Sequence, residues 1–419
     1  MIRTVSREIS WDGDLREIEP AIQHAVAPAY PLRWAITKVT SNSLWAEITI
    51  LEGLKIPEIS ATRHMPPNRN DSAFYVVTQL LPTGIGLELG GYAGDGTPAT
   101  NLLACAADRV VTHPNSVNAA ACNWASPNVW YVEGAMLDRW LAGNCALRPS
   151  RANRIGLLVD QGVEQAGGLQ LLENVANTFR MVGGGMVTLD LTAEPLALNL
   201  ARGPSGITHG ELANPEILLA SAKRLLATGA QAIALVGDFS YLAAPIEGYL
   251  GGQAPDPLGG LEAILSHFIS LALRVPCAHA PFIWPSSEPC DPRAAAEEIG
   301  GTYLACVLKG LQRAPRIVSG QDTSPGDLLA PDLVIAPASA MGSAGIIRAA
   351  CRGIPLLAVQ NSSILQVGPE QLGIAAEFAT SYLEAAGLVL AYRAGIDPAT
   401  IRRESGYALA RGLRSSMHR

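Results

Sequence analysis

Short runs of apolar residues recur along most of the chain and alternate with segments of helical pattern. Eight such runs are FYVVTQLL, DRVVTH, VWYVEG, RIGLLVD, GMVTLDL, QAIALVGD, DLVIAP and PLLAVQN. Each is short and almost continuously apolar, as is typical of strands buried on both faces of a parallel sheet. Helical patterns lie between several of them, at residues 217–230, 258–273, 292–311 and 343–354. The alternation predicts an α/β fold with a doubly wound, mostly parallel sheet in one or two Rossmann-like halves.

The first 70 residues have a different pattern. Residues 14–27 are compatible with an amphipathic helix, and residues 33–51 read as two strands joined by the turn Thr40-Ser41-Asn42-Ser43. Residues 63–72 are rich in Pro, Asn and charge, which indicates a linker. We therefore expect a small α+β unit at 1–70 and an α/β core at 71–419. If the core strands form two sheets, its lobes fall at about 71–210 and 211–400.

Composition restricts the partners and the location of the protein. Hydrophobic residues make up 48% and charged residues 16% of the chain, with a net charge of −7 and no Lys/Arg run. This excludes a disordered chain and gives no support to a nucleic-acid or membrane surface. The start, MIRTVSREISWDGDLREIEP, has no apolar signal core, and the scattered cysteines suit a reducing compartment, so we expect a cytoplasmic protein. The low charged share predicts a homodimer.

Polar residues follow several apolar runs, where ligands bind in open α/β sheets. His113 follows one run and Glu133 another, and both are candidate catalytic residues. The candidate substrate-binding residues at such strand ends are Asn115, Asn118, Ser339, Ser343 and Asn361. The alternative is that these side chains only cap the helices that follow.

A glycine-rich loop occupies residues 80–103. Gly84, Gly86 and Gly90 superficially resemble a dinucleotide fingerprint, but the glycines that follow at once would break the required helix. The lysine of a phosphate-binding Walker loop is also missing. Glycines still allow backbone N–H groups to approach an anion closely, so these three are candidate substrate-binding residues. Asp95 in the same loop is a candidate acid or base, metal ligand or turn former.

Cys277 and His279 form a third candidate group. They are two residues apart in an extended segment bounded by prolines, which places both side chains on one face. They would suit a nucleophile and its base, although a buried cysteine is often only part of the core. His267 lies on an apolar helix and is interpreted as a core or helix-contact residue. No metal-ligand spacing links the histidines, so we expect neither metal nor organic cofactor, while leaving a metal or nucleotide open.

A second loop offers an alternative. Residues 336–363 run from a strand through small residues into a helix, which suits an anion at the helix N-terminus. This segment is similar to the nucleotide-sugar loop of GT-B glycosyltransferases. It favours a transferase that uses a nucleotide-linked donor.

Six segments together resemble the DUF3326 family, found mainly in cyanobacteria, other bacteria and plastid-bearing plants. They are PTGIGLELGGYAGD (82–95), VTHPNSVNAA (111–120), YVEGAMLDRW (131–140), NRIGLLVDQGVE (153–164), PCAHAP (276–281) and CVLKGLQRAP (306–315). The resemblance covers roughly residues 80–395 and leaves the first 70 residues outside the common core. It implies that the family pattern includes Gly84, Gly86, Asp95, His113, Pro114, Asn115, Asn118, Glu133, Cys277 and His279. It implies no particular reaction.

These observations favour a cofactor-independent enzyme that acts on a small polar or anionic metabolite in a biosynthetic pathway. His113 or His279 is the expected base, Glu133 or Asp95 would orient the imidazole, and the glycine loop would donate N–H groups. Proton-transfer chemistry of the lyase, isomerase or hydrolase type follows. The alternatives are the transferase and a small-molecule-binding protein without catalysis.

Overall fold

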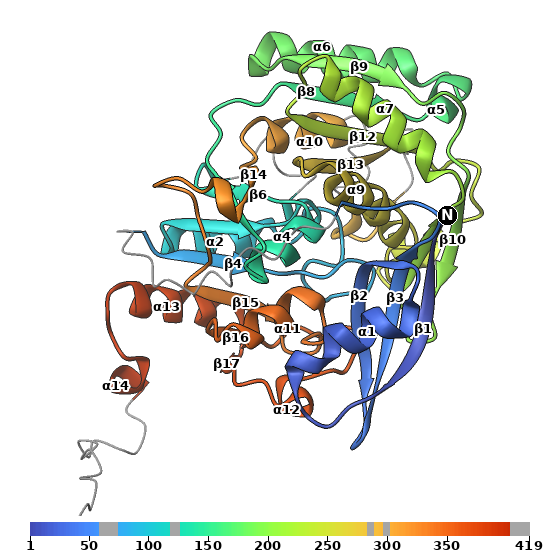
Figure 1. Ribbon diagram of the computed structural model, residues 1–419. Helices are drawn as coiled ribbons and strands as arrows, with labels where there is room; N and C mark the ends of the chain where they lie inside the picture. The colour runs from blue at the N-terminus through green and yellow to red at the C-terminus, as the bar shows by residue number, and fades with distance from the viewer. Residues whose placement is uncertain (58–73, 118–125, 283–288, 296–301, 403–419) are drawn as a thin grey trace, which may run out of the picture.

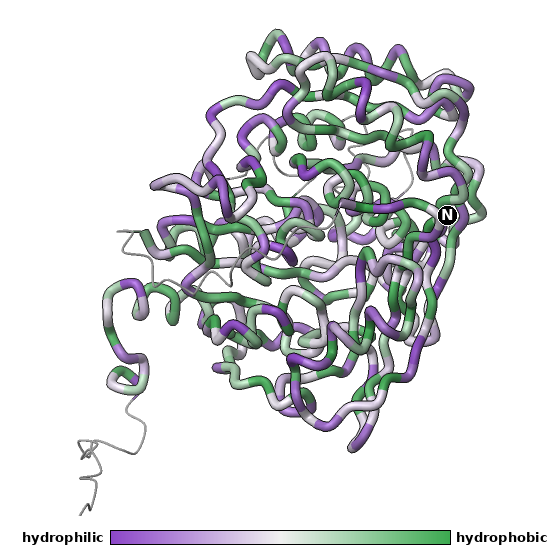
Figure 2. The backbone as a smooth tube through the Cα atoms, in the orientation of Figure 1, coloured by the Kyte–Doolittle hydropathy of each residue, from purple (hydrophilic) through white to green (hydrophobic). Residues whose placement is uncertain are grey.

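The computed structural model describes residues 1–57, 74–117, 126–282, 289–295 and 302–402. Within these residues the strands form two parallel sheets, one antiparallel sheet and one two-stranded sheet (Figure 1). Apolar residues run along the inner strands and helices, and polar residues gather on the outside (Figure 2). Among the described residues, no helix is long and apolar enough to cross a membrane.

A six-stranded parallel sheet begins just after the expected linker. Its order is β17-β16-β15-β4-β5-β6. The strands are β4 (Val76–Gln79), β5 (Arg109–Thr112), β6 (Val129–Tyr131), β15 (Leu333–Pro337), β16 (Leu356–Val359) and β17 (Glu377–Ala379). One face is covered by α2 (Thr97–Ala106) and α13 (Tyr382–Arg393), and the other contacts α11 (Ala344–Cys351), which packs on α4 (Gly134–Leu141). Helices on both faces bury the strands completely, which explains their continuous apolar runs.

A four-stranded parallel sheet forms the second half. Its order is β13-β12-β8-β9, with β8 (Ile155–Val159), β9 (Val187–Leu191), β12 (Ala232–Asp238) and β13 (Cys277–Phe282). Helices α7 (Pro215–Ala227) and α9 (Gly259–Leu273) cover one face, while α6 (Leu169–Gly183) and α10 (Thr302–Gln312) pack together over the other. Helix α9 is buried on nearly all sides because it also contacts α4, β2 and β11. Its almost uniformly apolar sequence is typical of a central helix.

The first strands form an antiparallel sheet with a hairpin from the middle of the chain. Its order is β10-β11-β1-β3-β2, with β1 (Ile2–Ser10), β2 (Tyr30–Val39), β3 (Ser43–Leu51), β10 (Leu198–Arg202) and β11 (Thr208–Leu212). A 3-10 turn, η1 (Leu15–Glu17), leads into α1 (Ile18–Val26). This helix buries Ile18, Ile22 and Val26, whose four-residue spacing places them on one face.

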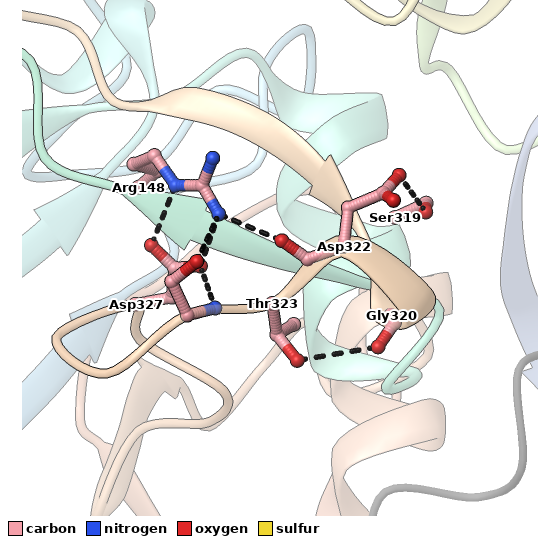
Figure 3. A network of polar contacts seen from close by, with 7 residues as sticks. Arg148, Ser319, Gly320, Asp322, Thr323 and Asp327 are labelled. Carbon is pink, nitrogen blue, oxygen red and sulfur yellow. Dashed lines mark hydrogen bonds and ion pairs between the residues drawn. The ribbon is translucent and has the colours of Figure 1, made fainter.

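The chain crosses twice between the two parallel sheets, and the strands in these two connections pair with each other. The chain leaves the larger sheet through β7 (Cys145–Arg148) and returns through β14 (Arg316–Ser319), and these strands are antiparallel neighbours. Arg148 holds the return crossing by donating to both carboxylate oxygens of Asp327, at 2.9 and 2.8 Å, and to the carbonyl of Asp322 (Figure 3). Both crossings are therefore tied together beside the junction of the sheets.

The remaining helical segments are short. They are α3 (Pro114–Val117), α5 (Gln161–Gln165), α8 (Ile246–Leu250), η4 (Gly320–Asp322), α12 (Pro369–Leu372) and α14 (Pro398–Arg402).

The predicted fold class is confirmed: the protein is a doubly wound α/β fold with a small antiparallel N-terminal unit. The larger parallel sheet takes its strands from residues 76–131 and 333–379, and the smaller one from residues 155–282. The antiparallel sheet combines residues 2–51 with residues 198–212. Each parallel sheet therefore takes strands from both expected lobes, 71–210 and 211–400. The antiparallel sheet combines strands of the expected unit 1–70 with the hairpin at 198–212.

Candidate active site

A small cavity lies beyond the carboxyl ends of β4 and β5, between the antiparallel sheet and α9. Its volume is about 100 Å³. The polar or charged side chains on its wall are those of Arg33, Thr83, His113, Asp138, His267 and Ser343. These residues come from β2, the glycine-rich loop, α4, α9 and the connections after β5 and β15. His113 and Ser343 both follow strands of this sheet and lie on the same cavity wall, at the edge where ligands bind in open α/β sheets.

Glu133 and His267 form a buried carboxylate–imidazole pair at this cavity. Glu133 caps α4, where its Oε2 accepts the N–H of Ala135 at 2.8 Å. Its Oε1 lies 2.5 Å from Nδ1 of His267 on α9. Burial opposes ionisation of Glu133, but the imidazole and the Ala135 N–H together hold its pKa below the usual value. The pair is an ion-pair contact, because Nδ1 of His267 has no partner with hydrogen-bond geometry among the described residues.

Gly134 makes room for this ring. A Cβ atom at position 134 would lie 3.0 Å from Cε1 and 3.3 Å from Nε2 of His267. Both Gly134 and His267 lie on the cavity wall. Nδ1 faces Glu133, so Nε2 is the nitrogen on the edge of the ring next to Gly134.

His113 is held as a neutral ring. Its Nε2 accepts the N–H of Leu81 at 3.2 Å, and the Ser116 hydroxyl lies 3.4 Å from the same nitrogen. Burial lowers the pKa of His113 to about 4, against the opposing effect of Glu133. A neutral imidazole that accepts at Nε2 carries its proton on Nδ1. His113 can therefore donate a hydrogen bond from Nδ1.

His279 lies behind the pair rather than on the cavity wall. Its Nδ1 is 3.0 Å from Oγ of Ser266, which in turn lies 3.5 Å from Oε1 of Glu133. Its Nε2 lies 3.5 Å from Glu262. Burial lowers the pKa of His279 to about 4. His279 thus joins the polar network beneath α9 that supports Glu133.

Arg33 brings a positive charge into the cavity from the N-terminal unit. Its Nη2 donates to the carbonyl of Thr83 at 3.0 Å, whereas Nη1 is buried and has no hydrogen-bond partner among the described residues. Burial lowers the pKa of the guanidinium, and the carboxylates of Asp138, Glu133 and Glu47 oppose this effect. A buried donor without a partner is costly in the free protein, and an anionic ligand would satisfy it.

Asp138 is the second carboxyl group at the site. Burial raises its pKa, and the Glu133 carboxylate adds to this effect, while Arg348, whose Nη1 is 3.9 Å away, opposes it. Glu133 and Asp138 therefore have pKa values displaced in opposite directions, as is typical of acid and base roles at one site.

Strand β2 reaches the cavity because it docks on the loop before α11. The N–H of Ile36 donates to the carbonyl of Gly342 at 2.8 Å, and Ala35 forms a bridge with Ser343. A Cβ at position 342 would lie 2.3 Å from the carbonyl oxygen of Ile36, so the close approach requires glycine. Part of the 336–363 loop proposed to hold phosphates thus faces β2.

Three further candidates from the strand ends, Asn361, Ser339 and Asn115, lie away from the cavity wall. Asn361 holds the glycine-rich loop, because its amide accepts from the N–H and donates to the carbonyl of Leu89. Ser339 donates to the carbonyl of Asn361 at 2.8 Å. The carbonyl of Asn115 accepts from the N–H of Gly94 at 3.3 Å. Asn118 lies outside the described residues.

The glycine-loop candidates also serve local structure. Gly84, with φ of 78°, approaches β11 so closely that a Cβ would lie 2.6 Å from Oγ1 of Thr208. Gly90, with φ of 93°, packs against Leu81, and Gly86 lines a separate pocket of about 360 Å³. Asp95 accepts from the N–H of Tyr92 at 3.2 Å within the loop.

Cys277 lies in the core beneath α9. It is 1% exposed, and burial raises the pKa of its thiol. It shares a face of β13 with His279, as the two-residue spacing predicts. Among the described residues, no three His, Cys, Asp or Glu side chains form a group that could hold a metal ion.

Sequence reasoning missed Arg33 and Asp138 and interpreted His267 as a core residue. His267 had a usable signal, since Glu262, Ser266 and His267 are polar positions in a helix that is otherwise apolar and buried. Buried polar groups in such a helix need hydrogen-bond partners, so their presence indicates a buried polar network around the helix. Arg33 had no local signal, because its place at the cavity depends on the docking of one sheet against another.

The fold and the site define an α/β protein of two parallel sheets with a buried histidine–carboxylate cavity at the strand ends. The family model for DUF3326, described as a protein of unknown function, matches residues 76–402. The chain belongs to this family, which confirms the resemblance inferred from the motifs. A curated relative from Synechococcus sp., called an uncharacterized lipoprotein, is 43% identical over 332 residues, covering 77% of this chain and 92% of the relative. Arg33 precedes the matched segment, whereas His113, Glu133, Asp138 and His267 lie within it.

Proposed function

We propose that the protein is a cofactor-independent enzyme that moves a proton on a small carboxylate-bearing metabolite. The main support is one arrangement: an imidazole in ion-pair contact with a buried carboxylate shares a cavity with a guanidinium nitrogen that has no partner among the described residues. Such a site combines a base with an anchor for an anion. The expected reaction class is a lyase, isomerase or hydrolase.

His267 is the proposed base. Oε1 of Glu133 lies 2.5 Å from Nδ1 without hydrogen-bond geometry. We assign the ring proton to Nδ1, which leaves the lone pair of Nε2 for a substrate proton. When Nε2 takes up a proton, the ring becomes a cation and the Glu133 carboxylate stabilises it at 2.5 Å. The polar network through Ser266 and His279 keeps the carboxylate in place.

Arg33 and His113 provide the complementary groups. Nη1 of Arg33 would bind the carboxylate of the metabolite, since guanidinium suits carboxylate geometry. Nδ1–H of neutral His113 would donate to the oxygen on which negative charge develops as the proton leaves. Asp138, with its raised pKa, is the proposed acid that returns a proton.

The size of the cavity limits the metabolite. Its volume of about 100 Å³ is below the roughly 150 Å³ of an engineered cavity that holds benzene. This supports a compact acid with about two to four carbon atoms.

Proton exchange provides the test. The protein is incubated in D₂O with a panel of small carboxylic acids, and loss of the C–H signal beside the carboxylate is followed by ¹H NMR. We expect exchange with at least one acid, and a reduction of about 10²–10⁴-fold in His267→Gln. The exposed His24 provides the matched control, because His24→Gln leaves the cavity unchanged. Acids that raise the melting temperature without any exchange would instead indicate a binding protein without catalysis.

The proposal includes a cytoplasmic location, a role in small-metabolite biosynthesis and a homodimeric state. The dimer is supported by the low charged share of the chain, 16%. Light scattering would then give twice the chain mass of 44.0 kDa.

A further inference from the structure

A second, larger groove lies along β6, the edge strand of the sheet that carries the candidate active site. It has a volume of about 640 Å³ and lies between β6 and the C-terminal part of α10. These two elements are in contact and lie near each other in Figure 1. Arg109 at the start of β5 lines this groove, and His113 past the end of β5 lines the cavity. Four residues along a strand span about 13 Å, so the groove is a separate place in the molecule.

Among the residues that the structure describes, the groove is lined by four positively charged side chains and by no Asp or Glu. The cations are Arg109, Arg151, Lys309 and Arg313, and they come from β5, the segment after β7 and α10 with its C-terminal end. Among the described residues, none of the four forms an ion pair with a carboxylate. The chain as a whole has a net charge of −7. Unpaired cations gathered in one groove of an acidic protein create a local field that attracts anions.

Arg109 is fixed in position within this group. Its guanidinium carbon lies 4.2 Å from the centroid of the Trp130 ring, a cation–π contact that leaves its N–H donors free. Trp130 is 8% exposed and therefore provides a rigid support. Lys309 lies in the last turn of α10, which ends at Gln312, and Arg313 follows the helix directly. The cations are thus presented from two opposite sides of the groove.

We propose that this groove binds a small molecule that carries two or more phosphate groups. Arginine matches phosphate oxygens through paired N–H donors, and lysine adds a compact charge. The volume of about 640 Å³ suits a ligand of nucleotide size, whereas the cavity of about 100 Å³ at the candidate active site does not. The groove is therefore a second ligand site, independent of the proton-transfer reaction proposed above.

Calorimetric titration of the full chain tests this inference. Tripolyphosphate, ADP and inorganic sulfate are titrated at about 0.15 M ionic strength, where the Debye length is about 8 Å and diffuse surface attraction is screened. Tripolyphosphate or ADP should bind in the micromolar range and sulfate much more weakly. The variant Lys309→Gln/Arg313→Gln should weaken the binding about 100-fold, since each lost charge-assisted contact costs roughly tenfold.

A matched variant distinguishes binding in the groove from nonspecific attraction of the anion to positive charges elsewhere on the surface. Arg180→Gln/Lys223→Gln removes two exposed charges from α6 and α7 and should leave the affinity unchanged. Equal weakening in both variants would overturn the proposal, as would the absence of binding below about 1 mM. Tighter binding of a single-stranded oligonucleotide than of tripolyphosphate would also overturn it, in favour of a nucleic-acid surface. His267→Gln should bind tripolyphosphate as the unmodified protein does, which distinguishes this site from the proposed reaction.

Discussion

Arg33 has an environment that stability alone would not select. One of its terminal nitrogens is buried without a partner among the described residues, and the other bonds to the carbonyl of Thr83. Buried donors that lack partners destabilise a folded protein, and such costs persist mainly at functional sites. A purely structural arginine would instead be paired on both sides.

This distinction predicts the behaviour of Arg33→Met. The unfolding free energy should stay within about 1 kcal/mol of the original or increase, because the lost bond to Thr83 is offset by removal of an unsatisfied donor. The stabilisation of the protein by small carboxylates should disappear. Chemical denaturation and thermal shift with acetate or pyruvate measure both effects. A loss of more than about 3 kcal/mol would mean that Arg33 is mainly structural.

His279 makes stability depend on pH. Its pKa is about 4 in the folded protein because of burial, against about 6.5 in an unfolded chain. Between these values the unfolded chain binds more protons, so stability is full above pH 6.5 and falls as the pH is lowered towards 4. The contribution is about 2 kcal/mol between pH 7 and pH 5. His279→Asn should show a smaller fall in urea denaturation over this range, whereas His24→Asn at an exposed position should not differ from the original. Equal pH dependence in all three proteins would contradict the assignment.

At the scale of elements, helix α4 positions the site through its first residue. Gly134 follows the capping Glu133, and its missing side chain leaves room for the His267 ring. In Gly134→Ala the new Cβ would lie 3.0 Å from Cε1 of His267, so the ring must move away from its place. We expect proton exchange to fall by up to about tenfold, because the ring must shift by a few tenths of an ångström and a shift of about 1 Å in a catalytic group costs about 100-fold. The melting temperature should hardly change, since alanine is the better helix former.

Gly387 provides the matched control for this substitution. It lies within α13, and a Cβ there would meet no atom within 4 Å. Gly387→Ala should leave proton exchange unchanged in the same NMR assay. If both alanine variants retain full exchange, the space at Gly134 has no role in the reaction.

The elements also show what the sequence could predict. All eight apolar runs contain strands, because burial on both faces leaves a continuous apolar signature. Strands β1, β7, β10, β11, β14 and β17 were not predicted. Apart from β1 they are short, and several lie at sheet edges or pair with distant segments. The residues of the candidate site show the same contrast between local signals and contacts with distant segments. His113, Glu133 and Ser343 follow buried strands and could be placed at the sheet edge, whereas Arg33 arrives through the contact between Ile36 and Gly342.

At the scale of the whole molecule, the N-terminal unit is an integral part of the fold although the family model begins at residue 76. Strand β1 pairs with β11, and β2 contacts α9 and α11. Trp34 is 3% exposed and Ile36 fully buried, so removal of this unit would expose a large apolar surface on the central helices. Each fully buried side chain of this size contributes about 1.5–3 kcal/mol, against a total stability of about 5–15 kcal/mol for a typical domain.

A chain reduced to residues 74–402 should therefore fail to unfold cooperatively. We expect it to be insoluble or to lack a sharp thermal transition in circular dichroism, because β11 and the faces of α9 and α11 lose their cover. Co-expression of residues 1–57 as a separate fragment should restore the transition, since the pairing of β1 with β11 and the packing of β2 on α9 and α11 do not require chain continuity. The restored complex should also regain stabilisation by small carboxylates through Arg33. A sharp transition of residues 74–402 alone, close to that of the full chain, would show that the family core folds independently and that the N-terminal unit only covers the site.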